Sequence, residues 1–496
     1  MYYVSTRDAG RRLTASQAIV EGLSRDGGLY LPEEIPQLTM DEIKALAALS
    51  YPERAAKLMK RYLDEFTEEE LLGFAKSAYG PAKFDTPAAA PVVRLTENTY
   101  IQELWHGPTC AFKDMALQML PYLLTASLRK TGEEKTVCIL VATSGDTGKA
   151  ALEGFRDVDR TKILVFYPDG GVSEMQKLQM VTQEGKNVGV CAVRGNFDDA
   201  QTGVKRIFGD KELAERLADD SHVVLSSANS INVGRLVPQV VYYFSAYAQL
   251  LERQVINVGD EVEFVVPTGN FGDILAGYYA KLLGLPVKHL VVASDKNNVL
   301  FDFLTSGTYN RQRPFFQTIS PSMDILISSN LERMLYYMSD KDTRLISMLM
   351  NDLSQWGAYE VPEPMMKKIR SIFGTGWADE NQVREMIADC WNKNHYVIDP
   401  HTACGYYVMQ QMPRDPLTPR VLLSTASPYK FPRVVNESLG LDASGTDFEC
   451  MDVLAKATGT TAPAALRGLE TADVRFDNVV EIDGMEGFVE QAAKAL

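Results

Sequence analysis

One lysine in the chain occupies a position in which lysines can do chemistry. Lys113 has apolar neighbours, among them Phe112 and Met115, and it stands just before a run that is apolar nearly all round. Such a run predicts a buried helix. Burial and a helix N-terminus both disfavour a positive charge, so we expect a lowered pKa, which suits Schiff-base formation. Taken alone, the stretch is more typical of a lysine whose stem packs while its ammonium reaches water.

Two turns with glycines and polar residues are predicted between a strand and a helix. Residues 142–148 read Ala-Thr-Ser-Gly-Asp-Thr-Gly, and residues 267–273 read Pro-Thr-Gly-Asn-Phe-Gly-Asp. Backbone N–H groups at a helix N-terminus stabilise an anion such as a phosphate or a carboxylate. The second turn lacks the glycine spacing of a nucleotide-binding loop. Each is also typical of a plain connection in which Asp146, Thr147 or Asp273 caps the next helix.

Two more turns carry polar side chains. Residues 226–239 contain hydroxyls, amides and Arg235 before a predicted helix, and an arginine there can bind an anion through two hydrogen bonds. Capping of that helix by Asn229 or Ser230, with a solvated arginine, is an equal alternative. Residues 424–432 follow another predicted strand. A hydroxyl in this segment could contact a ligand, or the segment could be a surface turn.

His401 is a candidate acid or base, although a structural histidine with hydrogen-bond partners is the commoner case. The five histidines include no pair at metal-ligand spacing, so no metal site is predicted. Ser144 and Ser424 lack the G-x-S-x-G context of a nucleophilic serine, which argues against a serine hydrolase.

An alternation of short apolar strands with helices must position these turns. Strands are predicted at residues 136–143, 162–167, 188–193, 223–226, 262–266, 287–293 and 420–424. Helices are predicted at residues 149–156, 173–183, 198–208, 233–252 and 273–283. This order predicts an α/β fold with a mainly parallel sheet covered on both faces. Ligands bind beyond the carboxyl ends of such strands, where the polar turns lie.

We expect three units along the chain. Residues 1–90 form a mostly helical N-terminal unit, with helices at 40–49, 52–66 and 67–77 and a capping box from Thr67 to Glu70. Residues 91–432 form the α/β core, with a helix-rich insertion around 311–390. Residues 433–496 form a C-terminal segment of short helices and loops.

Charge and cysteine content limit the partners and the compartment. A formal net charge of -15 argues against nucleic acid or an anionic membrane as the main partner. Six scattered cysteines are typical of a reducing compartment. No stretch reads as a targeting signal or a membrane span, so the cytoplasm is the expected location.

Taken in order, these segments resemble the motifs of threonine synthases, a family within the β-family (fold type II) of pyridoxal-phosphate enzymes. The matching segments are residues 26–32, 106–114, 144–148, 268–273, 319–324, 328–333, 399–403 and 424–428, and together they cover nearly the whole chain. The first 90 residues and Ser-Pro-Ser-Met-Asp at 320–324 are similar to the long microbial and fungal branch. The resemblance implies a tryptophan-synthase-β-like core with doubly wound, mainly parallel sheets and an N-terminal domain.

The resemblance also implies a role for each matching residue. Lys113 would hold pyridoxal 5'-phosphate and carry protons, and Thr425 would bond the pyridine nitrogen. The cofactor phosphate would lie in a cup formed by Gly269, Asn270, Phe271, Gly272 and Asp273. The substrate carboxylate would meet Ser144, Gly145, Asp146 and Thr147, where Asp146 replaces an asparagine of shorter relatives. The substrate phosphate would meet Ser230, Asn232 and Arg235.

The implied reaction converts O-phospho-L-homoserine and water into L-threonine and phosphate, the last step of threonine biosynthesis, in a monomer or homodimer. A related phospho-lyase would release phosphate and a 2-oxoacid from the same substrate. A non-enzymatic module that binds a phosphoamino acid or the cofactor is the more distant alternative. Delivery of water separates the first two reactions, and no residue identifies it.

Overall fold

Two mainly parallel sheets carry the polar turns. The computed structural model describes residues 1–143 and 145–495. In the larger sheet the strands lie in the order β13 (Phe373–Trp377), β10 (Val287–Ser294), β9 (Val262–Pro267), β14 (Arg420–Ser424), β4 (Thr99–Glu103) and β3 (Val92–Thr96). In the smaller sheet the order is β15 (Val479–Val480), β7 (Val188–Val193), β6 (Thr161–Pro168), β5 (Thr136–Ala142) and β8 (Val223–Ser226). Every pairing in these two sheets is parallel except that of β3 with β4.

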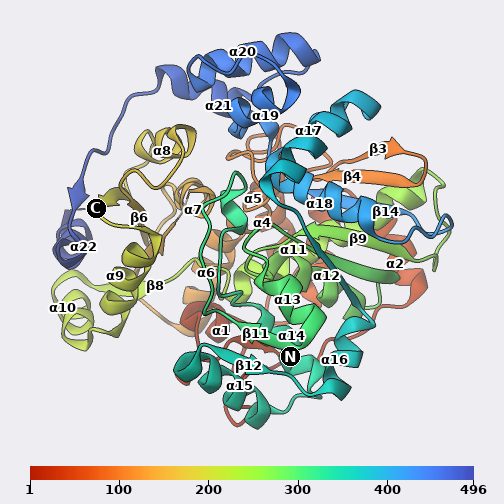
Figure 1. The fold of residues 1–496 in the computed structure, drawn as a ribbon. Helices are drawn as coiled ribbons and strands as arrows, with labels where there is room; N and C mark the ends of the chain where they lie inside the picture. Colours follow the sequence, from red (N-terminus) through yellow and green to blue (C-terminus); the bar gives the residue numbers. More distant parts are fainter. Residues whose placement is uncertain (144, 496) are drawn as a thin grey trace.

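Helices cover both faces of these sheets, as the apolar strands predict. Alternate residues of β5 enter different hydrophobic clusters: Ile139 and Val141 belong to the main cluster, whereas Cys138 and Leu140 belong to a smaller one. The core helices are α5 (Asp114–Leu117), α6 (Leu120–Thr131), α7 (Asp146–Phe155), α8 (Glu174–Val181), α9 (Phe197–Gly209), α10 (Lys211–Ser221), α11 (Val233–Glu252), α12 (Gly272–Leu282), α13 (Val299–Ser306) and α18 (Pro400–Gln411). Figure 1 shows the smaller sheet with α9 and α10 on the left and the larger sheet on the right.

The remaining elements surround this core. The N-terminal part contains β1 (Tyr3–Ser5), α1 (Ala15–Glu21), β2 (Tyr30–Pro32), α2 (Met40–Ala47), α3 (Tyr51–Lys60) and α4 (Glu68–Tyr79). The segment between β10 and α18 contains β11 (Thr308–Asn310), the short 3-10 helix η1 (Pro321–Met323), α14 (Leu331–Met338), α15 (Thr343–Trp356), β12 (Ala358–Glu360), α16 (Glu363–Arg370), β13 and α17 (Glu380–Asn394). In the described part, no helix combines the length and the apolarity that a bilayer crossing requires.

Helix α11 is the longest element, and its bounds agree with the prediction from sequence. Nearly all of its residues are buried, and it packs against α2, α3, α5 and α12. Its N-cap is Asn232, whose side chain accepts a hydrogen bond from the Gly234 N–H at 2.9 Å. Capping by Asn229 or Ser230 is therefore wrong. The predicted capping box of α4, from Thr67 to Glu70, is confirmed.

The C-terminal tail consists mainly of the predicted short helices and loops, but it also contains a strand. After η2 (Pro428–Lys430) it forms α19 (Pro432–Leu439), α20 (Asp447–Thr458), α21 (Ala464–Arg467), η3 (Gly468–Thr471), β15, η4 (Ile482–Gly484) and α22 (Met485–Ala495). Strand β15 extends the smaller sheet beside β7, and α22 packs against β6. Figure 1 shows this tail crossing from α20 and α21 to the far side of the smaller sheet. A two-residue strand has no alternation pattern, which is why the sequence did not predict it.

Arg333 joins three parts of the chain inside the core. Its side chain is fully buried, and its Nε donates to the carbonyl oxygen of Tyr30 at 2.9 Å. Its Nη1 and Nη2 donate to Asn330 Oδ1 and to the carbonyl oxygen of Ile231. The arginine thus connects β2, the start of α14 and the turn before α11.

We expect Arg333→Met to lower the free energy of unfolding by about 2–4 kcal/mol, because three buried acceptors lose their donors. Urea unfolding followed by circular dichroism measures this change. Arg344→Met, on the exposed face of α15, is the matched control and should change the same quantity by less than about 0.5 kcal/mol. Equal stability of the two variants would show that Arg333 is not a structural connector.

Candidate active site

A cavity opens where the carboxyl ends of β9 and β14 approach the turn before α11. It brings together eight of the residues predicted from sequence: Lys113, Ser230, Arg235, Gly269, Asn270, Gly272, Asp273 and Thr425. It also includes His401, the candidate acid or base, and residues for which the sequence suggested no role: Phe112, Gln239, Pro267, Ser322 and Met323. Three of the four polar turns, at residues 226–239, 267–273 and 424–432, contribute to this cavity, whereas the described residues of the turn at 142–148 do not line it.

Lys113 lies immediately before α5 on a loop that is firmly held. The Asp114 carboxylate accepts hydrogen bonds from the Thr109 N–H and hydroxyl, both at 2.8 Å. The carbonyl oxygen of Thr425 accepts from the Phe112 N–H at 2.8 Å, so Thr425 lies beside the lysine loop. Lys113 Nζ stands 4.2 Å from the centroid of the Phe112 ring. The loop thereby presents the amine to the cavity.

The pKa of Lys113 is lowered to about 8. Burial is the main cause, and the guanidinium of Arg235 lowers this pKa further. The carboxylates of Asp146 and Asp273 act in the opposite direction. With this pKa about a tenth of the amine is neutral at pH 7, far more than for a solvated lysine. Nucleophilic attack and proton transfer both require the neutral form.

The turn after β9 forms a cradle for an anion. A Cβ atom on Gly269 would lie 3.1 Å from the carbonyl oxygen of Ser322, and one on Gly272 would lie 3.4 Å from Asn330 Nδ2. That amide nitrogen is buried and has no hydrogen-bond partner among the described residues. An orphaned donor beside the N-terminus of α12 is the environment that a phosphate group satisfies.

Two residues of this turn have additional local roles. Phe271 adopts the left-handed backbone conformation, with φ of 62°, and its buried ring packs near Phe373 instead of lining the cavity. Asp273 lines the cavity, and its carboxylate also accepts from the Ile274 N–H at 2.8 Å. Burial raises the pKa of Asp273 to about 6.

Arg235 provides a second place for an anion. Its side chain is buried, and its Nη1 donates to the carbonyl oxygen of Ala228 at 3.0 Å, whereas its Nε has no partner among the described residues. No carboxylate lies within ion-pair distance of it in this part of the chain. Burial lowers its pKa to about 10. The alternative of a solvated arginine is wrong, because the Arg235 side chain is buried. A buried guanidinium that has no anionic partner among the described residues is suited to bind an anionic ligand.

The neighbours of Arg235 in sequence divide into two groups. Ser230 lines the cavity, and its Cβ lies 3.9 Å from the place of a Cβ on Gly272, so the two anion-binding turns meet. Asn232 does not line the cavity. Both polar atoms of its amide have structural partners, since Nδ2 donates to the carbonyl oxygen of Ile19 at 3.0 Å and Oδ1 caps α11.

The turn after β5 contributes a buried carboxylate. Ser144 lies outside the described residues, and Gly145, Asp146 and Thr147 do not line the cavity. Gly145 has a φ of 137°, and the Gln176 side chain occupies the space where a Cβ would stand. Gly145 is the N-cap of α7, so capping by Asp146 or Thr147 is wrong.

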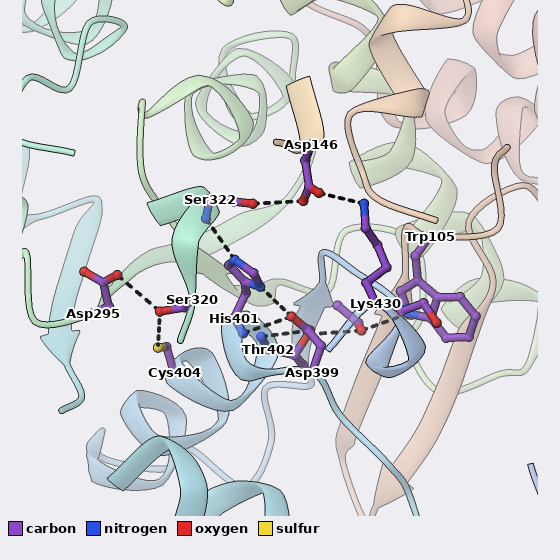
Figure 2. Close-up of polar contacts among 12 residues, drawn as sticks. Trp105, Asp146, Asp295, Ser320, Ser322, Asp399, His401, Thr402, Cys404 and Lys430 are labelled. Carbon is purple, nitrogen blue, oxygen red and sulfur yellow. Dashed lines mark hydrogen bonds and ion pairs between the residues drawn. The ribbon is translucent and has the colours of Figure 1, made fainter. Parts of the chain in front are cut away.

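The Asp146 carboxylate instead accepts hydrogen bonds from side chains of distant segments. Lys430 Nζ donates to Oδ1 at 2.6 Å, and the Ser322 hydroxyl donates to Oδ2 at 2.9 Å (Figure 2). Burial alone would raise the pKa of Asp146, but the Lys430 ammonium, together with His401 and Lys113, holds this pKa well below its usual range. The carboxylate is therefore ionised.

His401 belongs to the same network. Its Nε2 accepts the Ser322 backbone N–H at 3.1 Å, so Nδ1 carries the ring proton and donates to Asp399 at 2.6 Å (Figure 2). The histidine is thus hydrogen-bonded on both nitrogens, as the commoner alternative predicted, and it also lines the cavity. Every residue from 424 to 432 is buried, so the alternative of a surface turn is wrong.

The fold and this site define the class of the protein: it is a pyridoxal-phosphate-dependent enzyme of fold type II. The model "Pyridoxal-phosphate dependent enzyme" matches residues 84–348, and it is flanked by "Threonine synthase N terminus" at residues 2–79 and "Threonine synthase, C-terminal" at residues 402–489. The chain belongs to the threonine synthase family. The predicted α/β fold with doubly wound, mainly parallel sheets is confirmed.

Individual relatives agree with this result. Threonine synthase of Pseudomonas aeruginosa is 38% identical over 439 residues, which are 88% of this chain and 90% of the relative. Threonine synthase-like 1 of Homo sapiens is 39% identical over 454 residues, and this match covers 88% of this chain but only 60% of the longer human protein. A crystal structure of pyridoxal-phosphate-bound threonine synthase from Brucella melitensis has a TM-score of 0.89, 38% identity and coverage of 100% of both chains.

The cavity fits the cofactor of this family. Lys113 can bind the aldehyde, and the orphaned Asn330 amide with the glycines of the 269–272 turn can bind the phosphate. The sequence motifs gave no role to Asn330, Ser322, Asp399 or Lys430. The one available signal for Lys430 was its position between two aromatic residues after a strand, a place where a lysine is costly unless it is paired.

We expect the cofactor-free protein to bind pyridoxal phosphate covalently at a rate that rises with pH through about 8, because only the neutral amine of Lys113 attacks an aldehyde. Stopped-flow absorbance between about pH 6 and pH 10 measures this rate. Arg235→Met should move the midpoint to higher pH, since the guanidinium lowers the pKa of Lys113. The exposed substitution Arg216→Met is the control and should leave the midpoint in place. A midpoint near the ordinary lysine value of 10.5 in the unaltered protein would contradict the lowered pKa.

Proposed function

We propose that the protein converts O-phospho-L-homoserine and water into L-threonine and phosphate. The observation that carries this proposal is the pair of anion sites beside one lysine: the 269–272 turn with the Asn330 amide, and the buried, unpaired Arg235. A cofactor phosphate needs one such site, and a phosphorylated substrate needs a second. The names of relatives at 36–38% identity over most of the chain support the same reaction.

Each residue has a separate task in this proposal. Bound pyridoxal phosphate supplies the electron sink that makes the Cα–H of an attached amino acid acidic. Lys113 Nζ accepts the Cα proton and returns protons later in the reaction, which its lowered pKa allows. Arg235 holds the substrate phosphate and stabilises the charge that gathers on it as the Cγ–O bond breaks. Thr425, beside the lysine loop, is proposed to bond the cofactor ring nitrogen.

The same proposal assigns the α-carboxylate of the substrate to the turn at residues 144–147. His401 and Ser322 lie between this turn and the cavity, where they fix the position of Asp146. The chain is proposed to comprise the units 1–90, 91–432 and 433–496, with a small-molecule substrate and no nucleic-acid partner. A cytoplasmic location is proposed as well, and six buried, free cysteines support a reducing compartment.

The first test incubates the purified protein and pyridoxal phosphate with O-phospho-L-homoserine and identifies the carbon product. We expect L-threonine with an equal amount of phosphate, and we expect Lys113→Ala to lose both turnover and the visible absorbance of the lysine-bound cofactor. A 2-oxoacid with phosphate would replace the synthase by a phospho-lyase that uses the same site. Neither product, or an active Lys113→Ala variant, would contradict the assignment.

A second test separates the two anion sites. We expect Arg235→Gln to lower kcat/KM by about 100-fold, because it removes the charge that stabilises the departing phosphate. The dissociation constant for pyridoxal phosphate should change by less than about threefold, since its cup lies at the 269–272 turn. Steady-state kinetics and cofactor titration measure these quantities. Arg216→Gln on the surface is the control, and unchanged kinetics in Arg235→Gln would remove this arginine from the phosphate site.

A further inference from the structure

Lys430 forms a buried ion pair with Asp146 next to the candidate active site, where Asp146 contacts the cavity-lining Ser322. Its side chain is 0% exposed, that of Asp146 is 4% exposed, and 2.6 Å separates Lys430 Nζ from Asp146 Oδ1. The ammonium also donates to the carbonyl oxygen of Thr109 at 3.1 Å, on the loop that carries Lys113. Two charges lose most of their hydration at such a place, and only close contact with further hydrogen bonds offsets that loss.

The position of Asp146 creates an electrostatic conflict. The residue starts α7, in the turn proposed to receive the α-carboxylate of the substrate. An ionised side chain repels a second carboxylate, and little water is present to screen the repulsion. A helix N-terminus favours an anion there, but a bare negative charge on Asp146 would cancel that preference.

We propose that Lys430 is a positioning residue that neutralises Asp146, so that the turn at residues 145–147 admits the α-carboxylate of an amino acid. Lys430 also fixes the direction of the Asp146 carboxylate. While Oδ1 is held by the ammonium, Oδ2 accepts the hydroxyl hydrogen of Ser322, and the backbone N–H of Ser322 donates to His401 (Figure 2). The inference rests on the proposed function, because that proposal places the α-carboxylate at this turn.

The test compares four holoenzymes: the unaltered protein, Lys430→Met, Asp146→Asn and the double variant. Calorimetric titration measures the dissociation constants of L-threonine and of L-threoninamide, which lacks the carboxylate charge. We expect Lys430→Met to weaken L-threonine binding by at least about tenfold and L-threoninamide binding by less than about threefold. In the double variant, L-threonine binding should return to within about threefold of that of Asp146→Asn.

The double variant keeps the test decisive if Lys430→Met does not fold. Removal of one partner leaves a buried charge unpaired, whereas removal of both leaves none, so the double variant is expected to fold. L-threonine binding by the double variant equal to that of Asp146→Asn supports the proposal. The proposal is overturned if Lys430→Met weakens L-threonine binding equally in the presence and in the absence of the Asp146 carboxylate. It is also overturned if Lys430→Met weakens the binding of L-threonine and of L-threoninamide equally.

A matched pair on the surface provides the control. Lys288 and Asp415 form an ion pair at 2.5 Å with side chains 31% and 41% exposed. Lys288→Met, Asp415→Asn and their combination should leave both dissociation constants unchanged, because solvent screens an exposed pair. A loss of the same size in this control would show that lysine removal acts through general stability, which would overturn the role of Lys430.

Protonation of Lys113 provides a readout that does not depend on turnover. The pH profile for covalent attachment of pyridoxal phosphate should move upwards in Lys430→Met, move downwards in Asp146→Asn and nearly return in the double variant. These directions follow because the Lys430 ammonium lowers the pKa of Lys113 and the Asp146 carboxylate raises it. Unmoved profiles would show that the ion pair does not act on the site. The outcomes distinguish a failure of this inference from a failure of the proposed reaction. If the protein makes no threonine, yet the effect of Lys430→Met on L-threonine binding depends on Asp146, the proposed reaction fails and the inference stands. If the protein makes threonine but that effect does not depend on Asp146, only the inference fails.

Discussion

The contact between Asp146 and Lys430 ties together the turns of both sheets. Asp146 follows β5 of the smaller sheet, and Lys430 follows β14 of the larger one. Ser322, from the long segment between β10 and α18, bonds to the same carboxylate, and through its backbone it also holds His401. Three parts of the chain that are more than 100 residues apart therefore share one buried charge. The relative positions of these three segments therefore depend on the pairing of Asp146 with Lys430 and Ser322.

Neighbouring charges also set the pKa of Lys113. Burial makes its positive form costly, Arg235 adds to the cost, and Asp146 and Asp273 reduce it. The resulting pKa lies between that of a solvated lysine and that of a fully desolvated one. A change at any of these charged groups therefore changes the pKa of Lys113, although none of them lies on its loop. Lys430 contacts that loop through the carbonyl oxygen of Thr109.

Much of the fold could be predicted from the sequence, because buried parallel strands are continuous apolar runs and their helices have one clear apolar face. The bounds of β7, β8, β14 and α11 agree with the prediction. The hairpin of β3 and β4 and the short β15 were missed, since their pairing depends on partners that no local pattern reveals. The site was harder for the same reason. Turns carry recognisable motifs, whereas Ser322 becomes relevant only through contacts with residues 79 and 176 positions away, and Asn330 through an amide nitrogen that has no partner among the described residues. Asp399 becomes relevant through its contact with His401.

The overall charge of this protein disfavours an anionic ligand, whereas the local charge at the site favours one. A net charge of -15 repels a phosphorylated amino acid at long range, but at physiological salt that repulsion is screened within about 8 Å. The relevant local charges are Arg235 in the cavity, which lacks an anionic partner among the described residues, and Asp146 next to the cavity-lining Ser322, which has one cationic partner in Lys430. Because Lys430 neutralises Asp146, the guanidinium of Arg235 makes the local charge of the site positive. An acidic protein can therefore select a dianionic ligand, because desolvated groups at a few ångströms outweigh screened groups on the surface.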